Sequence, residues 1–329
     1  MADATERVTA FAARAMGSPL RLTLGARASR ADETAHWWRA VVDEFEAAEQ
    51  AMSRFRETSE VTTLNRLAGS GIAAQPSARL RQALVVSDRA RRITGGRFDP
   101  RVLADLDRLG YRGAPIDQGP VASPPADRDA RPVGRPAADE PVVERVGRDH
   151  LTLGTAVDLG GIGKGLTLRW AAATLSARGA EDFLLEAGGD LVARGQSPEA
   201  GPWRLGIDDP AGGPEPVAVI AVDDLAVATS STRINRWMVE GREVHHLLDP
   251  RTGEPFDGGL LSVTVAAADP AWAEVWSKVL FLDGRGGIAP EARSRGLTAW
   301  WVAEDGALEM TPAARAMTIW VAGEAAPAD

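Results

Sequence analysis

The sequence has no cysteine, one tyrosine and only four histidines among its 329 residues. Without cysteine it cannot form disulfides, iron–sulfur clusters or zinc sites with thiolate ligands. Two histidines, His36 and His150, stand far apart in the chain, and only His245 and His246 are adjacent. A metal site built from several histidines is therefore not expected.

Long apolar runs are also missing. No stretch approaches the roughly 20 apolar residues that cross a bilayer as a helix. The N-terminal stretch MADATERVTAFAARAMGS carries acidic residues early and lacks the apolar segment of a signal peptide. The sequence accordingly predicts a cytoplasmic protein with neither a lipid anchor nor membrane insertion.

The composition is typical of a soluble globular protein, with 44% hydrophobic residues, 25% charged residues and a net charge of −9. The negative balance disfavours general affinity for nucleic acid, although it is compatible with a local basic pocket. The length allows one large domain or two small ones. We expect a single domain over residues 1–329.

Helical patterns fill much of the first third, and strand patterns fill most of the remainder. Apolar residues recur at helical spacing over residues 31–56 and 77–93, whereas residues 20–26 alternate like a strand. Residues 1–15 resemble a loose or helical lead. Residues 112–146 are rich in Pro, Asp, Arg and Ala without periodicity, which indicates a disordered surface loop. This order favours the α+β class, with a helix-rich N-terminal third and a strand-rich remainder.

The most informative stretch is VDLGGIGKG at residues 157–165, here called the glycine loop, which joins a short apolar run to a helical pattern. Its glycines allow positive φ and close approach of a ligand. A helix start favours anions, and Lys164 adds a positive charge. The stretch matches neither a Walker A loop nor GxGxxG. Taken alone, it fits a phosphate or pyrophosphate site and a structural strand-to-helix turn equally well.

Three further polar turns are candidates for binding or catalysis. Gly188-Gly189-Asp190 follows a strand pattern and is more often a hairpin turn than a ligand contact. Residues 228–232, ATSST, end a strand with hydroxyls that form either a solvated turn or the wall of a polar ligand site. Residues 245–253, HHLLDPRTG, combine a histidine pair with turn-forming residues, and a histidine there is either structural or a base.

Together, these segments resemble the FAD:protein FMN transferase family, the ApbE-type flavin transferases. The resemblance rests on the ordered series MGSPLRL, AMSRFRETSEVTTLN, GGRFDPRV, VDLGGIGKG, LEAGGDL, AVATSS, HHLLDPRTGEP and SVTVAAAD. It implies binding of FAD and magnesium, and transfer of the FMN half of FAD to a threonine or serine hydroxyl of a target protein, with release of AMP. Some members hydrolyse FAD to FMN and AMP instead.

The resemblance also implies roles for individual residues. It implies that His246 is the base for the acceptor hydroxyl, and that Lys164 supplies the catalytic positive charge at the phosphates. The residues that it implies as FAD contacts are Met16 on the flavin ring; Asp158, Gly160, Gly161 and Lys164 in the glycine loop; Gly188, Gly189 and Asp190 in the second glycine turn; and Thr229 and Ser230 in the hydroxyl turn.

One departure from the family pattern concerns magnesium. The family usually has Ala-Asp-x-x-x-Thr at the helix after SVTV, with the Asp, the Thr and a glycine-loop carbonyl as metal ligands. Here Glu274 and Lys278 stand at the two side-chain positions, which leaves Glu274 and the Gly163 carbonyl as the implied ligands. The two side chains equally fit a plain i,i+4 helix pair. The alternative functions are therefore an FAD-binding protein without transferase activity, because the magnesium site is altered, and an FAD pyrophosphatase.

Overall fold

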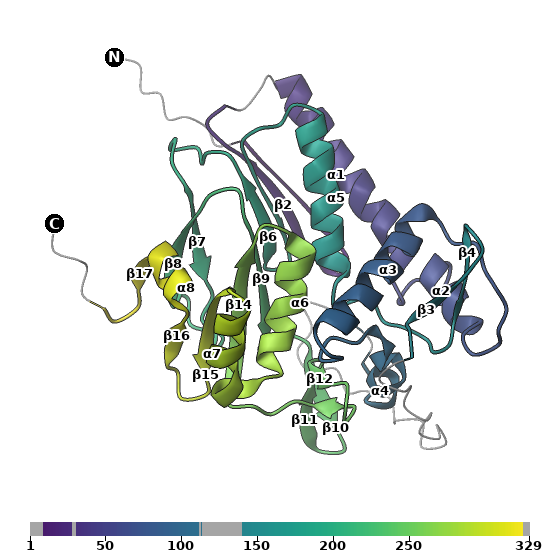
Figure 1. The fold of residues 1–329 in the computed structure, drawn as a ribbon. Coiled ribbons are helices and arrows are strands. Elements are labelled where there is room, and N and C mark those ends of the chain that lie inside the picture. Colours follow the sequence, from purple (N-terminus) through teal and green to yellow (C-terminus); the bar gives the residue numbers. More distant parts are fainter. Residues whose placement is uncertain (1–8, 28–30, 112, 114–139, 325–329) are drawn as a thin grey trace, which may run out of the picture.

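The computed structural model describes residues 9–27, 31–111, 113 and 140–324. A long sheet runs through the middle of the molecule, with helices on one side and a smaller sheet on the other (Figure 1). The predicted loop over residues 112–146 lies largely outside the described part. Its last residues, Val143–Val146, form strand β3, so the loop prediction is wrong there. The predicted loose or helical lead is also wrong for Ala10–Ala15, which forms strand β1.

The N-terminal third is helix-rich, as predicted. Ser59 and Ser77 begin the second and third helices, because each hydroxyl oxygen accepts a hydrogen bond from the amide three residues further on. Among the described residues, no helix combines the length and the apolarity needed to cross a membrane. The helices are α1 (Ala31–Met52), α2 (Glu60–Arg66), α3 (Ala78–Ile93), the 3-10 turn η1 (Pro100–Val102), α4 (Leu103–Arg108), α5 (Gly163–Ala177), α6 (Pro270–Phe281), α7 (Gly284–Ser294) and α8 (Pro312–Met317).

An antiparallel sheet of eight strands in the order β1-β2-β5-β6-β9-β14-β15-β16 forms the centre of the fold. Its strands after β1 are β2 (Ser18–Leu24), β5 (Phe183–Ala187), β6 (Asp190–Arg194), β9 (Ala226–Ser231), β14 (Leu260–Ala267), β15 (Thr298–Ala303) and β16 (Leu308–Met310). The smaller sheet, in the order β17-β8-β7, comprises β7 (Trp203–Ile207), β8 (Ala218–Val222) and β17 (Thr318–Val321). The two-stranded pairs are β3 with β4 (His150–Leu153), β10 (Arg236–Val239) with β11 (Arg242–His245), and β12 (Leu248–Asp249) with β13 (Glu254–Pro255).

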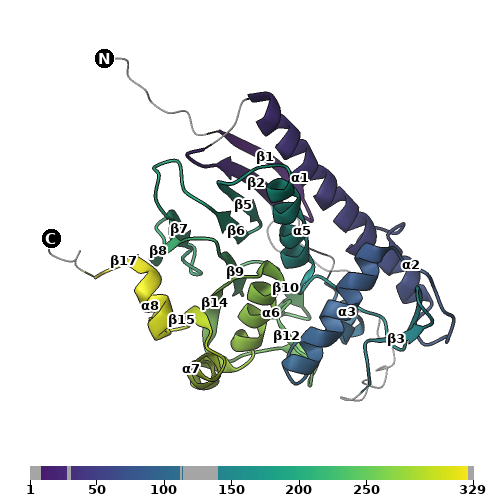
Figure 2. The same ribbon diagram turned by 45° about the horizontal axis from the view of Figure 1, so that its top comes forward.

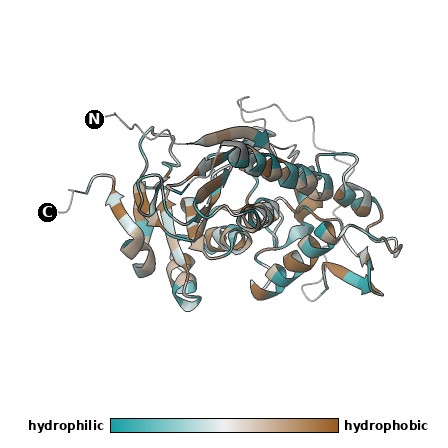
Figure 3. Ribbon diagram, turned by 90° about the horizontal axis from the view of Figure 1, so that it is seen from above, coloured by the Kyte–Doolittle hydropathy of each residue, from teal (hydrophilic) through white to brown (hydrophobic). Residues whose placement is uncertain are grey.

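Different elements bury the two faces of the central sheet. Helices α1 and α5 run side by side over one face, where Leu22 packs with Phe45 and Leu168 in one core cluster (Figure 2). The smaller sheet covers the opposite face, where Ile220 packs with Trp300. Hydrophobic and hydrophilic residues alternate around the helices, as expected where one side of a helix meets a core (Figure 3).

Two tight turns lie at the same end of the sheet. Leu20 pairs with Ala187 across β2 and β5, so the β1–β2 turn at residues 16 and 17 lies beside the β5–β6 turn at residues 188 and 189. All four turn residues have positive φ, between 50° and 91°, as a two-residue hairpin turn requires. Helix α5 begins at this end too, which brings three of the predicted site segments together.

Candidate functional site

The glycine loop is held in shape from two sides. The Asn65 side chain on α2 brackets Val157: its Nδ2 donates to the Val157 carbonyl at 2.8 Å, and its Oδ1 accepts from the Val157 amide at 2.9 Å. Asp158 accepts a hydrogen bond from the Gly160 amide at 2.6 Å and pairs with Nε of Arg54 at 2.5 Å. Both carboxylate oxygens of Asp158 therefore serve to shape the loop.

Packing explains two of the loop's glycines without any ligand. A Cβ on Gly161 would lie 3.1 Å from the ring of Phe98. A Cβ on Gly165 would lie 2.5 Å from the Pro270 carbonyl oxygen, in the backbone of α6. A Cβ on Gly163, where α5 begins, would make only ordinary contacts. Ile162, the N-cap residue of α5, makes no capping hydrogen bond, and the carboxylate of Glu274 on α6 accepts one from the first-turn amide of Gly165 instead.

Four charged side chains meet beside the start of α5 and form what we call the lysine–carboxylate cluster: Lys164, Asp190, Glu274 and Lys278. Lys164 pairs with Asp190, and Lys278 Nζ donates to Glu274 Oε1 at 3.2 Å. Lys164 Nζ lies 3.8 Å from the same Glu274 oxygen. The carboxylate side chains are 3% and 1% exposed, whereas Lys164 and Lys278 are 24% and 19% exposed. The lysine side chains are thus the more exposed part of a cluster that contains two basic and two acidic groups.

The cluster favours the charged forms of Lys164 and Glu274, whereas burial raises the pKa of Asp190. Burial opposes the charge of Lys164, but Asp190 and Glu274 outweigh it and raise the lysine's pKa. Burial alone would raise the pKa of Glu274, yet Lys278 and Lys164 hold that pKa below its usual value. Glu274 Oε2 also accepts a hydrogen bond from the Gly165 amide at 2.8 Å, which ties α6 to α5. Both groups are therefore ionised at neutral pH.

His246 lies in the electrostatic field of the same two lysines. Burial, reinforced by the charges of Lys278 and Lys164 and by His245, lowers its pKa to about 3 from an ordinary 6.5. The ring is therefore neutral at pH 7 and can accept a proton. Its Nδ1 is buried and finds no hydrogen-bond partner within the described part of the chain. A buried polar atom without a partner is unusual and fits a position that a ligand or water completes.

Two residues that sequence reasoning missed connect His246 to the glycine loop. Tyr111 stacks near His246, with ring centroids 6.3 Å apart, and on Trp237 at 5.1 Å. Burial, with a further contribution from Asp158, raises the tyrosine's pKa to about 12. Arg54 donates to the Tyr111 carbonyl at 2.9 Å as well as pairing with Asp158. The available signal was that Tyr111 is the chain's single tyrosine.

The two predicted hydroxyl residues, Thr229 and Ser230, lie on opposite faces of strand β9. Successive residues of a strand point to opposite faces of a sheet. Ser230 on β9 is buried against α6, with its hydroxyl 2.8 Å from that of Ser277. Thr229 is exposed, with its hydroxyl 2.9 Å from that of Thr264. The Thr229 amide donates to Asp190 at 3.1 Å, so the backbone, more than the hydroxyls, links this strand to the lysine–carboxylate cluster.

The two hairpin turns flank the cluster. Gly188 approaches Ser18 so closely that a Cβ would lie 2.7 Å from the serine Cβ, and it would lie 4.0 Å from Cδ of Lys164. Met16, in the other turn, donates its amide to the Glu49 carboxylate. The methyl group of Met16 would be 3.6 Å from a Cβ on Gly163. Met16 and Gly188 thus lie beside the start of α5.

The residues at this site do not fit a magnesium ion. Both Glu274 oxygens are engaged, one by the Gly165 amide and the other by Lys278. The Gly163 carbonyl accepts a hydrogen bond from the Thr167 hydroxyl at 2.7 Å. Over the described ranges, no group of three or more His, Asp or Glu side chains is arranged to hold a metal. Magnesium is usually held by one or two carboxylates together with waters and substrate phosphates, and Glu274, the carboxylate implied for it here, already has both oxygens engaged.

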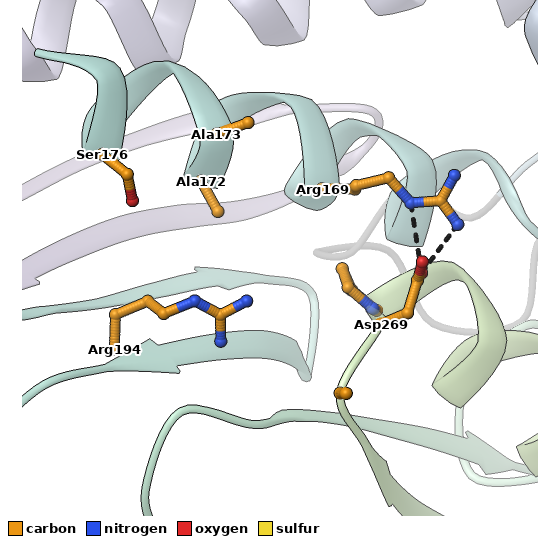
Figure 4. A pocket seen from close by; sticks show the side chains of 8 residues that line it. Arg169, Ala172, Ala173, Ser176, Arg194 and Asp269 are labelled. Atoms are coloured by element: carbon orange, nitrogen blue, oxygen red, sulfur yellow. Dashed lines mark hydrogen bonds and ion pairs between the residues drawn. The ribbon is translucent and has the colours of Figure 1, made fainter.

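Two hollows lie away from these residues. One, of about 250 Å³, is bounded by Arg169, Arg194 and Asp269, toward the other end of α5. Figure 4 shows the guanidinium groups of Arg169 and Arg194 on either side of it, with Arg169 paired to Asp269 at 2.7 Å. The other, of about 550 Å³, lies between α1, α3 and α5 beside Trp170. Neither is lined by a residue that the sequence predicted for FAD or catalysis.

Comparison with known proteins relates residues 16–301 to the ApbE family model. The chain is 29% identical over 195 residues to an FAD:protein FMN transferase of Klebsiella pneumoniae, an alignment that covers 58% of this chain and 56% of the relative. It is 27% identical over 252 residues to one of Haemophilus influenzae, covering 71% and 68%. The chain thus spans little more than half the length of the first of these relatives.

Solved structures share the fold at low sequence identity. The ApbE protein of Thermotoga maritima superposes with a TM-score of 0.81 at 23% identity, covering 94% of this chain and 99% of the other. The apo flavinyl transferase ApbE of Pseudomonas stutzeri gives a TM-score of 0.77 at 24% identity, covering 94% and 96%. These similarities confirm the predicted α+β fold.

Proposed function

Because the chain belongs to the ApbE family, we propose that it transfers the FMN half of FAD onto a threonine or serine hydroxyl of an acceptor protein and releases AMP. FAD is then a substrate, and the second partner is a protein that this chain does not contain. We include in this proposal the contacts with FAD that the resemblance implies for Met16, the glycine loop and the second glycine turn.

The observation that carries the proposal is that Lys164 lies at the start of α5 beside the buried carboxylates, and that its charge acts on the neutral, buried His246. Lys164 and the helix start favour the negative charge of a pyrophosphate. The buried Nδ1 of His246 has no hydrogen-bond partner among the described residues, and a bound substrate would supply one. These features would supply the positive charge that the reaction needs at the phosphates and the base that it needs at the hydroxyl.

In the proposed reaction, the acceptor hydroxyl oxygen attacks the phosphorus on the FMN side of the pyrophosphate. A new phosphoester bond forms, the bond to the bridging oxygen breaks, and AMP leaves with that oxygen. His246 accepts the proton of the hydroxyl. Lys278 and Lys164 contribute to the low pKa of this histidine in the free protein. Bound phosphate charges would offset them, so the imidazole becomes a stronger base when substrate is present.

Incubation with FAD and a protein extract as acceptor source tests the proposal. In-gel flavin fluorescence reports covalent FMN on protein, and chromatography reports AMP. We expect AMP to form together with protein-bound FMN, and both to be lost in His246→Gln while FAD still binds.

Other outcomes would identify one of the alternative functions. Free FMN and AMP in equal amounts, without labelled protein, would identify water as the acceptor and the protein as an FAD pyrophosphatase. Tight FAD binding without any AMP would identify a flavin-binding protein that does not transfer. Absence of FAD binding would overturn the proposed function altogether.

A further inference from the structure

The chain contains only two lysines among its 37 basic residues, and the fold brings both to one carboxylate oxygen. Lys164 on α5 and Lys278 on α6 approach Oε1 of Glu274 to 3.8 and 3.2 Å. Arginine serves at all other basic positions. A compact ammonium with freely rotating donors differs in kind from a planar guanidinium, and the chain has the ammonium only at these two positions.

The partly exposed side chain of Lys278 lies against the glycine loop. A Cβ on Gly161 of the glycine loop would lie 3.5 Å from both Cδ and Cε of Lys278. The side chain thus passes beside Gly161, and its Nζ donates to Glu274 Oε1. The charge of Lys278 also acts on His246 and on Asp190, which places its ammonium among the groups of the proposed reaction.

We propose that Lys278 supplies, as a fixed ammonium, a positive charge at the phosphates of bound FAD, so that binding needs no divalent cation. The inference rests on the proposed function for the identity of the ligand. The lysine–carboxylate cluster is electrically balanced without a metal, and a divalent ion placed at Glu274 would meet a like charge at Lys278. The three donors of the ammonium can contact phosphate oxygens directly.

Calorimetry of FAD binding in EDTA and across a magnesium titration gives the first test. We expect the wild-type affinity to be unchanged by magnesium. Lys278→Met is expected to weaken binding roughly ten- to hundredfold, the effect of losing one charge-assisted contact. Arg92→Met is the matched control, because Arg92 forms an i,i+4 ion pair with Asp88 on α3, outside the cluster.

Lys278→Met leaves a buried carboxylate without its partner and could unfold the protein. Glu274→Gln combined with Lys278→Met removes both charges together and keeps the shapes of the side chains close to the originals. This double variant is expected to fold and to show the same loss of FAD affinity. Wild-type affinity in the folded double variant would overturn the inference.

Lysine labelling gives a second test that does not depend on activity. Acetic anhydride can modify only two ε-amino groups in this chain, and mass spectrometry separates them. We expect FAD in EDTA to protect both Lys164 and Lys278 from acetylation. Protection of Lys164 alone would overturn the inference.

A third test uses a double variant in which FAD binding should depend on magnesium. Glu274→Asp combined with Lys278→Thr replaces the ammonium with an oxygen ligand and shortens the carboxylate. We expect FAD binding by this variant to be weak in EDTA and restored by magnesium. If wild type binds FAD only with magnesium, the role of Lys278 is refuted while the proposed function stands. If wild type binds no FAD under any condition, both fail.

Discussion

Replacing Gly165 by Ala tests whether the glycine loop is built for packing against α6. The added Cβ would lie 2.5 Å from the Pro270 carbonyl oxygen and 2.6 Å from Cα of Ala271, whereas ordinary contacts begin at 3.4 Å. Both neighbours are backbone atoms, so α5 and α6 must separate by about an ångström. Overpacking of this kind costs about 1–3 kcal/mol.

The separation also disturbs the hydrogen bond from the Gly165 amide to Glu274. A hydrogen bond to a charged group contributes about 1.5–3 kcal/mol. The helix propensity of alanine is higher than that of glycine, which offsets up to about 1 kcal/mol of this loss of stability. We therefore expect Gly165→Ala to lower the free energy of unfolding by about 2–5 kcal/mol, where a whole domain has only about 5–15 kcal/mol.

Urea unfolding at pH 7, followed by the fluorescence of the ten tryptophans, measures this change. Gly163→Ala is the matched control, because it lies two residues away on the same helix and its Cβ would make only ordinary contacts. We expect the control to change stability by less than about 1 kcal/mol. Equal stability of the two variants would refute the packing argument.

Three further predictions concern the site and the segment that lies outside the described residues. Lys164→Ala should weaken FAD binding roughly ten- to hundredfold in calorimetry, and unchanged affinity would mean that Lys164 does not contact the phosphates. His246 has a folded-state pKa of about 3, below the ordinary 6.5, so the unfolded chain binds its proton first and stability falls as pH drops below 6.5. Between pH 7 and 5, wild type should therefore lose about 2 kcal/mol more than His246→Gln in urea unfolding, and equal losses would place the histidine pKa near its ordinary value. Replacing residues 114–139 by a short Gly-Ser linker should leave the melting temperature nearly unchanged, because loop length alters closure entropy only slowly; a large drop would show that the segment packs on the domain.

Periodicity predicted the elements whose pattern is long and local. The helix over residues 31–56 appears as α1 (Ala31–Met52), and that over 77–93 as α3 (Ala78–Ile93). The error at Ala10–Ala15 has a physical cause. This stretch, AFAARA, is rich in alanine and favours helix by propensity, but it pairs with β2 along its whole length at the sheet edge. Tertiary pairing decided its conformation, and no local pattern encodes that pairing.

The site was predictable where a turn encodes it and unpredictable where a side chain crosses the fold. The glycine turns and Lys164 are recognisable from consecutive residues. Arg54 contacts both Asp158 of the glycine loop and Tyr111, and each of these partners lies more than fifty residues further along the chain. Such contacts depend on how α1 and the loop pack. The segment AMSRFRETSEVTTLN belongs to the family resemblance, but no local pattern in it assigns a role to Arg54.

The four charges beside α5 explain why a loop typical of phosphate binding is compatible with a site that does not fit magnesium. Asp190 and Glu274 are buried, and buried carboxylates need compensating charge. Lys164 and Lys278 provide it from within the chain, so the cluster is complete before any ligand arrives. A metal would have to displace a lysine to enter. In the proposed function, a pyrophosphate would only have to share the donors of two partly exposed lysine side chains, which favours the anion over a divalent cation.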